Sequence, residues 1–419
     1  MFSSIHRSYT GLLVNATGLS MVSNNLSNLN TVGYKRSQAN FGQLMANSSL
    51  AASGNGNPVQ IGLGAATSEV ISSFNQGSFI NTGEGTDLAL QGNGFFVVNN
   101  GTDTSYTRAG NFTLNSNGFL VSASGHNVQG YTETNADGTI NTTGTVGDIF
   151  VDFEAGSPPR ATDQVRFVTN LNATAEVGEE FVSSLNVFDS NGEEHALNLK
   201  YTKTANEGEW SYEFLTEAGT VSTTSPTQGS GTMTFDANGQ LSLVDGASLS
   251  AASNRTVGVS GVDGGAEDLA FTWEVFNSDT NSGFLTNLGQ RSNTGSAYQN
   301  GTSSGNLQRV EFALNGTMFG FYDNGDNVAL AQVALATFPN NQGLRQRADG
   351  LFQQGPTSGA ANLEPAGRTQ VFTRTLETSN VDIAEEFTDL IIHQRGYQSN
   401  AKSISTADQV IQEIVNLKR

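Results

Sequence analysis

Hydrophobic positions recur with a helical period at the two ends of the chain and in no other long stretch. In residues 1–30 a seam recurs at alternating spacings of four and three, at Ile5, Tyr9, Leu12, Ala16, Leu19, Ser23 and Leu26. Residues 379–419 repeat it at Ile383, Phe387, Leu390, Gln394, Tyr397, Ala401, Ile404, Asp408, Ile411 and Val415. A period of 3.5 residues is that of a coiled-coil seam. The sequence therefore predicts two long terminal helices that pair with each other.

Capping residues set the expected bounds of these helices. Ser3 or Ser4 can cap the amino helix, which we expect to end near Asn28–Asn30. Ser379, followed three residues later by Asp382, has the spacing of a capping box for the carboxyl helix. Both helices carry further apolar residues outside the seam, more than one partner helix can cover. We therefore expect them to pair and then to pack on other copies, although packing on the body of their own subunit is an alternative.

The residues between the helices are rich in Gly and Asn and predict β-structure. Apolar and polar residues alternate from Phe181 to Val187 and from Leu197 to Tyr201, as in sheets with one solvated face. Asn-Gly pairs predict tight hairpin turns with positive φ angles, for example at Asn93-Gly94, Asn100-Gly101, Asn117-Gly118, Asn191-Gly192, Asn238-Gly239, Asn315-Gly316 and Asn324-Gly325. The predicted fold class is mixed but mainly β.

The middle of the chain divides by composition into three predicted regions. Residues 31–70 are polar and aperiodic and predict an extended linker. Residues 71–156 and 301–378 predict an inner β-domain, and residues 157–300 an outer β-domain that is inserted in it. Pro158-Pro159 and the Gly/Ser/Asn tract 292–306 mark the two crossings between these domains, and both Trp residues fall in the outer one.

Composition excludes several classes of protein. A net charge of −20 argues against nucleic-acid binding, which relies on Lys and Arg. The chain has no Cys and no run of about 18 apolar residues, so disulfides, Cys-ligated metals and a membrane span are not expected. No secretory signal is visible. No acidic residue precedes Glu69, so an organelle transit peptide is an alternative interpretation of the amino end.

No catalytic or metal-binding pattern stands out. The four histidines, His6, His126, His195 and His393, are scattered without metal-ligand spacing, and each is expected to be a surface or packing residue. Neither Gly-x-Gly segment, at Gly62–Gly64 or Gly92–Gly94, precedes a predicted helix as a phosphate loop would. We expect no enzyme activity, no cofactor and no bound metal.

Three stretches together resemble the axial proteins of the bacterial flagellum. SNNLSNLNTVGYK at residues 23–35 resembles the signature that follows the amino helix in rod and hook members. TDLALQGNGFFVV at 86–98, with YTRAGNF at 106–112, resembles the first β-domain of that family. The terminal block, from SNVD at 379–382 through QRGYQ at 394–398 to NLKR at 416–419, resembles its closing helix. The segments 185–192 and 231–239 resemble the outer β-domain of the hook members.

This resemblance implies a structural subunit of the flagellar hook, polymerising into a hollow, flexible tube that joins rod to filament and transmits torque. It also implies export through the flagellar type III apparatus without a cleaved signal, an extracellular location, and contacts with the hook cap, distal rod and hook–filament junction proteins. The seam residues are the expected subunit interface. Asn25, Asn28, Gly33 and Tyr34 are carried over as signature positions.

Two other functions remain open from the sequence. A distal-rod protein with an unusual insertion would form stiff, straight polymers, whereas a hook protein would form curved ones. A β-rich surface adhesin would need a signal or anchor and a functional surface within residues 157–300.

Overall fold

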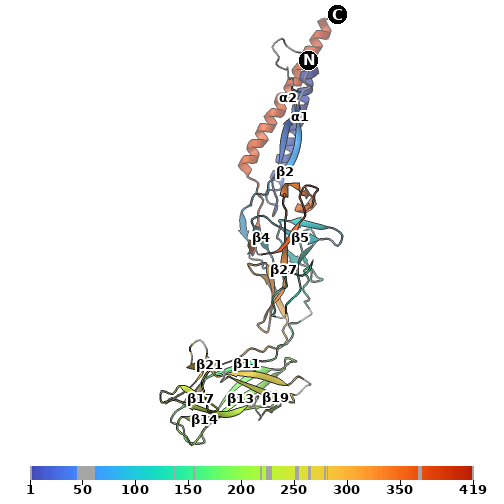
Figure 1. Cartoon of the computed structure of the whole chain (residues 1–419). Coiled ribbons are helices and arrows are strands. Elements are labelled where there is room, and N and C mark those ends of the chain that lie inside the picture. The colour runs from blue at the N-terminus through green and yellow to red at the C-terminus, as the bar shows by residue number, and fades with distance from the viewer. Residues whose placement is uncertain are drawn as a thin grey trace, which may run out of the picture. The chain divides into compact units, whose positions relative to one another are not determined.

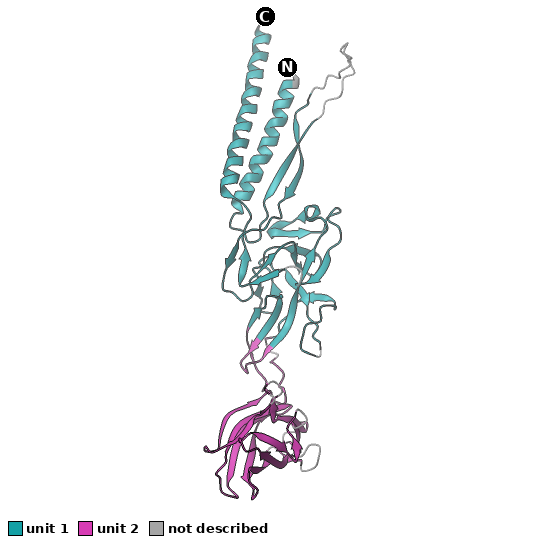
Figure 2. Ribbon diagram, turned by 60° about the vertical axis from the view of Figure 1, so that its left-hand side comes forward, with its two compact units in different colours: residues 1–152, 310–320, 328–419 teal, residues 153–309, 321–327 magenta. Residues whose placement is uncertain are grey.

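The computed structural model describes residues 2–44, 62–135, 137–153, 156–217, 219–222, 229–250, 254–262, 266–277, 280, 282–366 and 370–417. Over these residues the chain is mainly β, with one long helix near each end, which confirms the predicted class at that level. It divides into two compact units (Figure 2). Unit 1 comprises residues 1–152, 310–320 and 328–419, and unit 2 comprises residues 153–309 and 321–327.

The two long helices of unit 1 lie side by side and antiparallel. They are α1 (Phe2–Ser27) and α2 (Ile383–Leu417), and the two chain ends lie at the same end of the pair (Figure 1). Because α1 begins at Phe2, the predicted start after Ser3 or Ser4 is wrong, and its end at Ser27 falls just before the predicted Asn28–Asn30.

The predicted capping box of α2 is wrong in detail. Asp382, which immediately precedes the helix, is the residue that caps it, because its Oδ1 accepts from the backbone N–H of Ala384 at 2.8 Å and of Glu385 at 3.2 Å. Ser379 Oγ accepts only from the N–H of Val381, at 3.4 Å, outside the helix.

Unit 1 contains a small hydrophobic core within a twelve-stranded sheet, whose main path is β25-β26-β27-β9-β5-β6-β29-β28. Phe95 and Val97 of β5, Tyr106 of β6 and Phe352 of β29 are buried in this core. Unit 1 contains β3 (Phe79–Asn81), β4 (Leu88–Gln91), β5 (Phe95–Asn99), β6 (Thr104–Thr107), β7 (Thr113–Leu114), β8 (Leu120–Val121), β9 (Asn127–Tyr131), β10 (Val146–Asp148), β25 (Leu307–Phe312), β26 (Thr317–Tyr322), β27 (Asn327–Thr337), β28 (Arg345–Gln346), β29 (Leu351–Gln353), β30 (Asn362–Pro365), β31 (Gln370–Thr373) and β32 (Thr375–Glu377). Of these, β25, β26 and β27 run across the boundary with unit 2 in sequence.

The segment after α1 contains a β-hairpin where the sequence indicated only an extended linker. β1 (Ser37–Gln43) pairs antiparallel with β2 (Ala65–Ser72), from Ser37 opposite Ser72 to Gln43 opposite Ala65. Both strands contact α1. The hairpin gives no alternating sequence signal because neither strand has one buried and one solvated face. Residues 45–61 of the predicted linker lie outside the described residues.

Unit 2 is built from two six-stranded sheets around one large core. The sheet paths are β15-β19-β20-β11-β23, with β24 also paired to β11, and β12-β13-β14-β16-β17-β18. Trp210 and Trp273 are fully buried in the core between them. The strands are β11 (Gln164–Asn172), β12 (Glu180–Phe188), β13 (Glu194–Lys203), β14 (Glu209–Thr216), β15 (Thr220–Val221), β16 (Ser230–Phe235), β17 (Leu241–Val244), β18 (Ala247–Ser248), β19 (Arg255–Ser260), β20 (Leu269–Glu274), β21 (Phe276–Asn277), β22 (Ser282–Gly283), β23 (Leu285–Leu288) and β24 (Asn293–Gln299).

The alternation predicted for β12 and β13 is present. Val187, Leu197, Leu199 and Tyr201 are buried, whereas the intervening residues of β12 are exposed. One face of this sheet therefore contributes to the core and the other faces solvent.

The Asn-Gly pairs do not form the tight hairpin turns with positive φ angles at both residues that the sequence predicted. In the hairpin around Gly192, Asp189 N–H donates to Glu193 O, and the N–H of Gly192 donates to Asp189 O. Only the glycine has a positive φ there, 81°. This is a type I turn followed by a glycine bulge, which replaces the two-residue turn with two positive φ angles. At Asn93-Gly94 the positive φ, 96°, belongs to Gly92.

Candidate subunit interface

The contact between α1 and α2 lies one residue away from the predicted seam on both helices. On α1 the most enclosed positions are Gly18, Val22 and Asn25, each one residue before the predicted Leu19, Ser23 and Leu26. On α2 the contacting side chains belong to positions such as Glu386, His393 and Asn400, one before Phe387, Gln394 and Ala401. One residue is about 100° of helix rotation. The predicted stripe therefore lies beside the contact and not in it.

Glycines and polar side chains fit together in this contact. A Cβ added to Gly18 would lie 2.5 Å from His393 Cε1, one added to Gly11 would lie 2.9 Å from Asn400 Nδ2, and one added to Gly396 would lie 2.4 Å from Asn15 Oδ1. Asn15 Oδ1 is also 3.3 Å from His393 Nδ1, and the ring of His393 packs edge-on against Phe41 of β1. Each glycine thus forms a notch that admits a polar side chain, which lets the helices approach closely.

Four apolar residues of the predicted seam remain exposed inside the subunit. Tyr9, Ile383, Phe387 and Tyr397 expose 51, 47, 52 and 38% of their surface. The prediction that they pair across the α1–α2 contact of one chain is wrong, because the glycines and the polar side chains that fit against them occupy that contact. Ile5, Leu12, Ala16, Leu19, Leu26, Leu390, Ala401, Ile404 and Ile411 are half-buried, and the side chain of Val415 lies outside what the structure describes.

Other apolar residues of the two helices enlarge this exposed surface. Leu13, Ile391, Ile392, Val410 and Ile414 expose between 39 and 57% of their surface. Large apolar surfaces left open on a soluble chain mark interaction sites. We call the exposed seam residues Tyr9, Ile383, Phe387 and Tyr397, together with these five, the apolar face.

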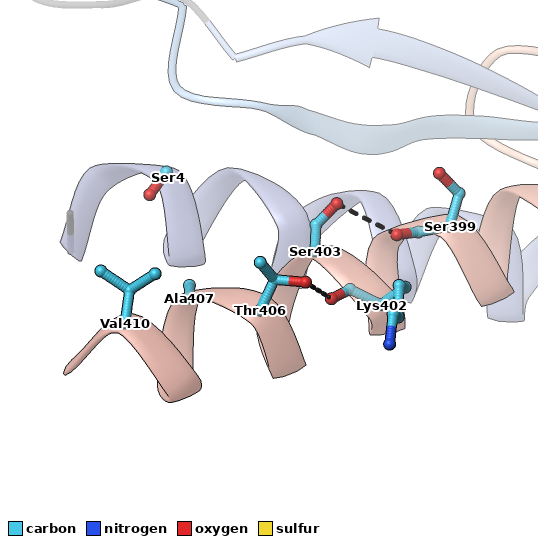
Figure 3. A pocket seen from close by; sticks show the side chains of 7 residues that line it. All are labelled: Ser4, Ser399, Lys402, Ser403, Thr406, Ala407 and Val410. Atoms are coloured by element: carbon cyan, nitrogen blue, oxygen red, sulfur yellow. Dashed lines mark hydrogen bonds between the residues drawn. The ribbon is translucent and has the colours of Figure 1, made fainter. Parts of the chain in front are cut away.

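A cavity lies along the helix pair near the chain ends. Figure 3 shows Ser4 of α1 opposite Ala407 and Val410 of α2. Ser403 Oγ and Thr406 Oγ1 donate back to carbonyls of their own helix, those of Ser399 and Lys402, at 3.1 and 2.9 Å. Both hydroxyls are thus bonded within α2, and an open cavity of about 570 Å³ lies there.

At the other end of the pair, the signature residue Asn25 joins three segments. It is 2% exposed. Its Nδ2 donates to Ser37 O at 2.9 Å and to Glu386 Oε1 at 3.1 Å, and its Oδ1 accepts from Ser37 N–H and from the Tyr34 hydroxyl. A buried amide with all of its hydrogen bonds made fixes one arrangement of its neighbours. Asn25 therefore sets α1 against both the following turn and α2.

Gly33, Tyr34 and Asn28 shape the turn after α1. Gly33 has φ +69°, and a Cβ there would lie 2.5 Å from the backbone nitrogen of Ala109, so only glycine fits. Burial raises the pKa of Tyr34, whose hydroxyl lies inside the turn. Asn28 Nδ2 donates to Asn24 O at 2.9 Å and its Oδ1 accepts from Thr31 Oγ1, which closes the end of α1.

Next to this turn is a buried ionic cluster that sequence analysis missed. Glu377 of β32 pairs through Oε1 with Lys35 Nζ at 2.6 Å and through Oε2 with Arg108 Nη1 at 3.3 Å. All three side chains are at most 1% exposed. Burial lowers the pKa of Lys35, an effect that Glu377 partly offsets, and burial also lowers the pKa of Arg108. A buried pair of this kind is costly to break on one side only.

A second ionic cluster links the turn to the start of α2. Arg36 contacts Glu385 Oε1 at 2.6 Å, Glu386 Oε1 at 2.5 Å and Asp389 Oδ2 at 3.0 Å. We call these three carboxylates the acidic cluster. The backbone N–H of Arg36 also donates to Asn380 Oδ1 at 2.7 Å. The carboxylates that Arg36 contacts are about 350 residues away in sequence, so no local sequence pattern indicates this cluster.

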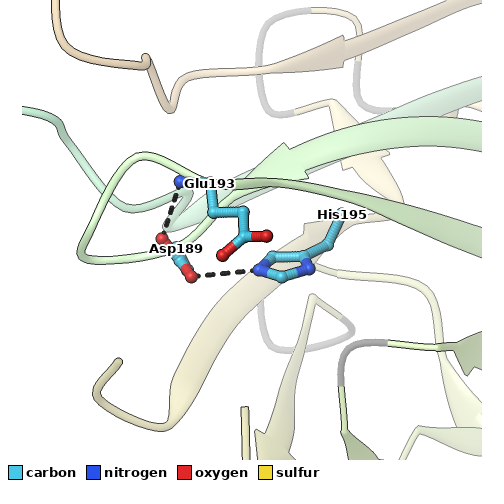
Figure 4. A group of neighbouring side chains, drawn as sticks. All are labelled: Asp189, Glu193 and His195. Carbon is cyan, nitrogen blue, oxygen red and sulfur yellow. Dashed lines mark hydrogen bonds and ion pairs between the residues drawn. The ribbon is translucent and has the colours of Figure 1, made fainter. Parts of the chain in front are cut away.

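In unit 2, Asp189, Glu193 and His195 bring three potential metal ligands together on one hairpin (Figure 4). Asp189 Oδ1 accepts from the backbone N–H groups of Asn191 and Glu193, each at 2.9 Å, and its Oδ2 lies 3.0 Å from His195 Nε2. These contacts give the aspartate a role in the turn that needs no ion. His195 is thus a packing residue of this turn.

Four family models match separate parts of the chain. They are Flagella basal body rod protein at residues 10–35, Flagellar hook protein FlgE/F/G D1 domain at 89–151, Flagellar basal body protein FlaE D2 domain at 161–302, and Flagellar basal body rod FlgEFG protein C-terminal at 373–417. The first and last contain most of α1 and α2. Over the residues that the structure describes, no helix combines the length and apolar character that a membrane span requires.

Whole-chain relatives carry the same description. The flagellar hook protein FlgE of Treponema pallidum is 30% identical, with both chains covered completely, and that of Salmonella typhimurium is 32% identical, over 99% of this chain and all of the relative. A crystal structure of Helicobacter pylori flagellar hook protein FlgE2 covers 71% of this chain at 15% identity and a TM-score of 0.47, which by itself does not establish a shared arrangement. The chain therefore belongs to the flagellar hook protein family, a family of structural proteins and not of enzymes, and it is a structural subunit of the bacterial flagellar hook.

Proposed function

We propose that this subunit polymerises by burying its apolar face against the terminal helices of other copies. One observation carries the proposal: α1 and α2 meet through glycines and polar side chains, while Tyr9, Ile383, Phe387 and Tyr397 remain exposed beside that contact. Burying an aliphatic or aromatic side chain of this size is worth about 1.5–3 kcal/mol. The free energy of assembly thus comes from residues that the isolated chain leaves in water.

In the assembled tube, the terminal helices (residues 1–30 and 379–419) form an inner layer in which seams of different copies pack as coiled coils. Residues 31–70 connect this layer to an inner β-domain (71–156 and 301–378), in which the outer β-domain (157–300) is inserted. Firm apolar contacts between helices, with more polar contacts between β-domains, allow the tube to bend while it transmits torque. The hook then acts as a universal joint between rod and filament.

Assembly places this chain outside the cell, next to several partners of the flagellum. The subunit is exported by the flagellar type III apparatus without a cleaved signal. It polymerises under a hook cap, on the distal rod, and ends at the hook–filament junction proteins. It carries out no catalysis and needs no cofactor.

Removal of α1 tests this proposal. A chain lacking residues 1–30 is expected to form no tubes in electron micrographs, because Tyr9 and Leu13 of the apolar face and the whole α1–α2 contact are lost. Unit 2 should keep its fold, reported by the fluorescence of Trp210 and Trp273, which both lie in its core. Tube formation by the shortened chain would contradict the proposal.

Curvature separates a hook from a rod. Tubes of the complete chain are expected to be curved and flexible, and uniformly straight tubes would favour the distal-rod alternative.

A further inference from the structure

Between Ile383 and Lys402 the charged side chains of α2 are sorted by sign, and the acidic residues Asp408 and Glu413 follow closer to its end. The acidic cluster, Glu385, Glu386 and Asp389, lies in its first two turns. Arg395 and Lys402 follow, and both are exposed. The α1 helix has no acidic residue at all. The helix pair therefore has a negative band next to the β-domain and a positive band farther along α2.

The acidic cluster contains fewer cations than carboxylates. Three carboxylates share one guanidinium, that of Arg36. The side chain of Glu386 is fully buried, and among the described residues its Oε2 has no hydrogen-bond partner. Glu386 and Asp389 line a cavity of about 260 Å³ between α1, α2 and β1. A buried carboxylate oxygen without a partner is costly, so an additional cation at this site is stabilising.

The positive band lies on a different side of α2. Arg395 and Lys402 are seven residues apart and so share one stripe of the helix, about 110° around the axis from the stripe of Glu385 and Asp389. Within the part of the chain that the structure describes, neither Arg395 nor Lys402 pairs with a carboxylate. Two complementary patches on different sides of one subunit suit a heterologous contact, in which each copy uses one patch toward each neighbour.

We propose that Arg395 and Lys402 of one copy dock on the acidic cluster of a second copy that runs parallel to it. The centres of the two bands are separated by about 17 Å along α2 at 1.5 Å per residue. The pairing therefore fixes the axial offset between neighbouring copies, whereas the apolar face supplies most of the affinity. This inference rests on the proposed polymerisation and specifies its register.

Charge reversal with complementation tests the pairing. The Arg395→Glu/Lys402→Glu variant has two acidic patches, and the Glu385→Lys/Asp389→Lys variant has two basic ones. Each variant alone is expected to have a critical concentration for polymerisation at least about tenfold higher than the parent at low salt. The reason is that each reversal replaces attraction between close charges at the interface by repulsion. An equimolar mixture should polymerise nearly as the parent chain does, because each variant complements the other. Arg291→Glu, an exposed reversal in unit 2, is the matched control and should behave as the parent.

The outcomes separate this inference from the proposed function. Circular dichroism first establishes that both variants keep their helices. If the parent and both variants polymerise equally well, or if the mixture is no better than either variant alone, the charge pairing is overturned and the proposed polymerisation stands. If the parent chain itself forms no tubes, both are overturned.

Discussion

Unit 2 buries its large apolar side chains, whereas the helix pair of unit 1 leaves many of its own exposed. Unit 2 encloses its large residues, and Trp210, Trp273, Tyr201 and Phe271 are fully buried. The helix pair leaves Phe387, Ile391 and Ile392 about half exposed and closes its internal contact with glycine, asparagine and histidine. Unit 2 therefore completes its core within one chain, whereas the apolar face is exposed in one chain and, under the proposed polymerisation, is buried by further copies.

The largest expected effect is on the completed core. Trp273→Ala should destabilise unit 2 by about 3–5 kcal/mol, because it removes a fully buried aromatic side chain and leaves a cavity. Denaturant unfolding followed by the fluorescence of Trp210 measures the loss, and circular dichroism should show that α1 and α2 remain. Unfolding of the helices together with unit 2 would contradict the independence of the two regions.

A similar loss is expected in unit 1 from its buried ionic cluster. Glu377→Gln removes the charge that Lys35 and Arg108 share, which should cost about 3 kcal/mol. Glu385→Gln is the matched control, because that side chain is 58% exposed and should cost less than about 1 kcal/mol. Chemical denaturation followed by circular dichroism compares the two. Equal losses of unfolding free energy in the two variants would mean that the ion pairs of Glu377 do not stabilise unit 1.

A smaller loss of stability is expected from a substitution in the contact between α1 and α2. It would distinguish this contact, which is closed in the monomer, from the apolar face. Gly18→Ala places a methyl group 2.5 Å from the ring of His393, so the ring or the helices must shift at a cost of about 1–3 kcal/mol. Ser20→Ala, at an exposed position of α1, is the control. Hydrogen exchange of α1 in the monomer should rise in the first variant only. Unchanged exchange in Gly18→Ala would argue against close packing at this notch.

The mildest test uses alkaline pH. Burial raises the pKa of Tyr201 and Tyr212 in the core of unit 2. A tyrosine whose folded pKa lies above its unfolded value, about 10, contributes stability that is fully present below that pH and is lost as pH rises toward the folded pKa. The thermal midpoint of unit 2 should therefore fall above about pH 10, and absorbance at 295 nm should show these tyrosinates forming only on unfolding. Ionisation of both before unfolding would be inconsistent with their burial.

The sequence was enough to locate both helices to within a few residues and to predict β-structure between them, because 3.5-residue and two-residue periods are local signals. It placed the α1–α2 contact on the wrong stripe because it assumed that apolar residues such as Phe387 pair within the chain. Gly11, Gly18 and Gly396 carry no apolar signal, although the seven-residue spacing of Gly11 and Gly18 on α1 was visible. The partners of Glu377, Lys35 and Arg108, lie 342 and 269 residues away in sequence, so only the fold brings them together.

Thiol labelling at Phe387 tests the central claim most directly. The chain has no Cys, so Phe387→Cys introduces a single reactive side chain. In the free subunit this thiol should react rapidly with a water-soluble reagent, since Phe387 is 52% exposed. In assembled tubes it should be protected, and reactivity should return when the tubes are dissociated. Protection in the free subunit, or undiminished reactivity in intact tubes, would contradict the claim that the apolar face is completed only by other copies.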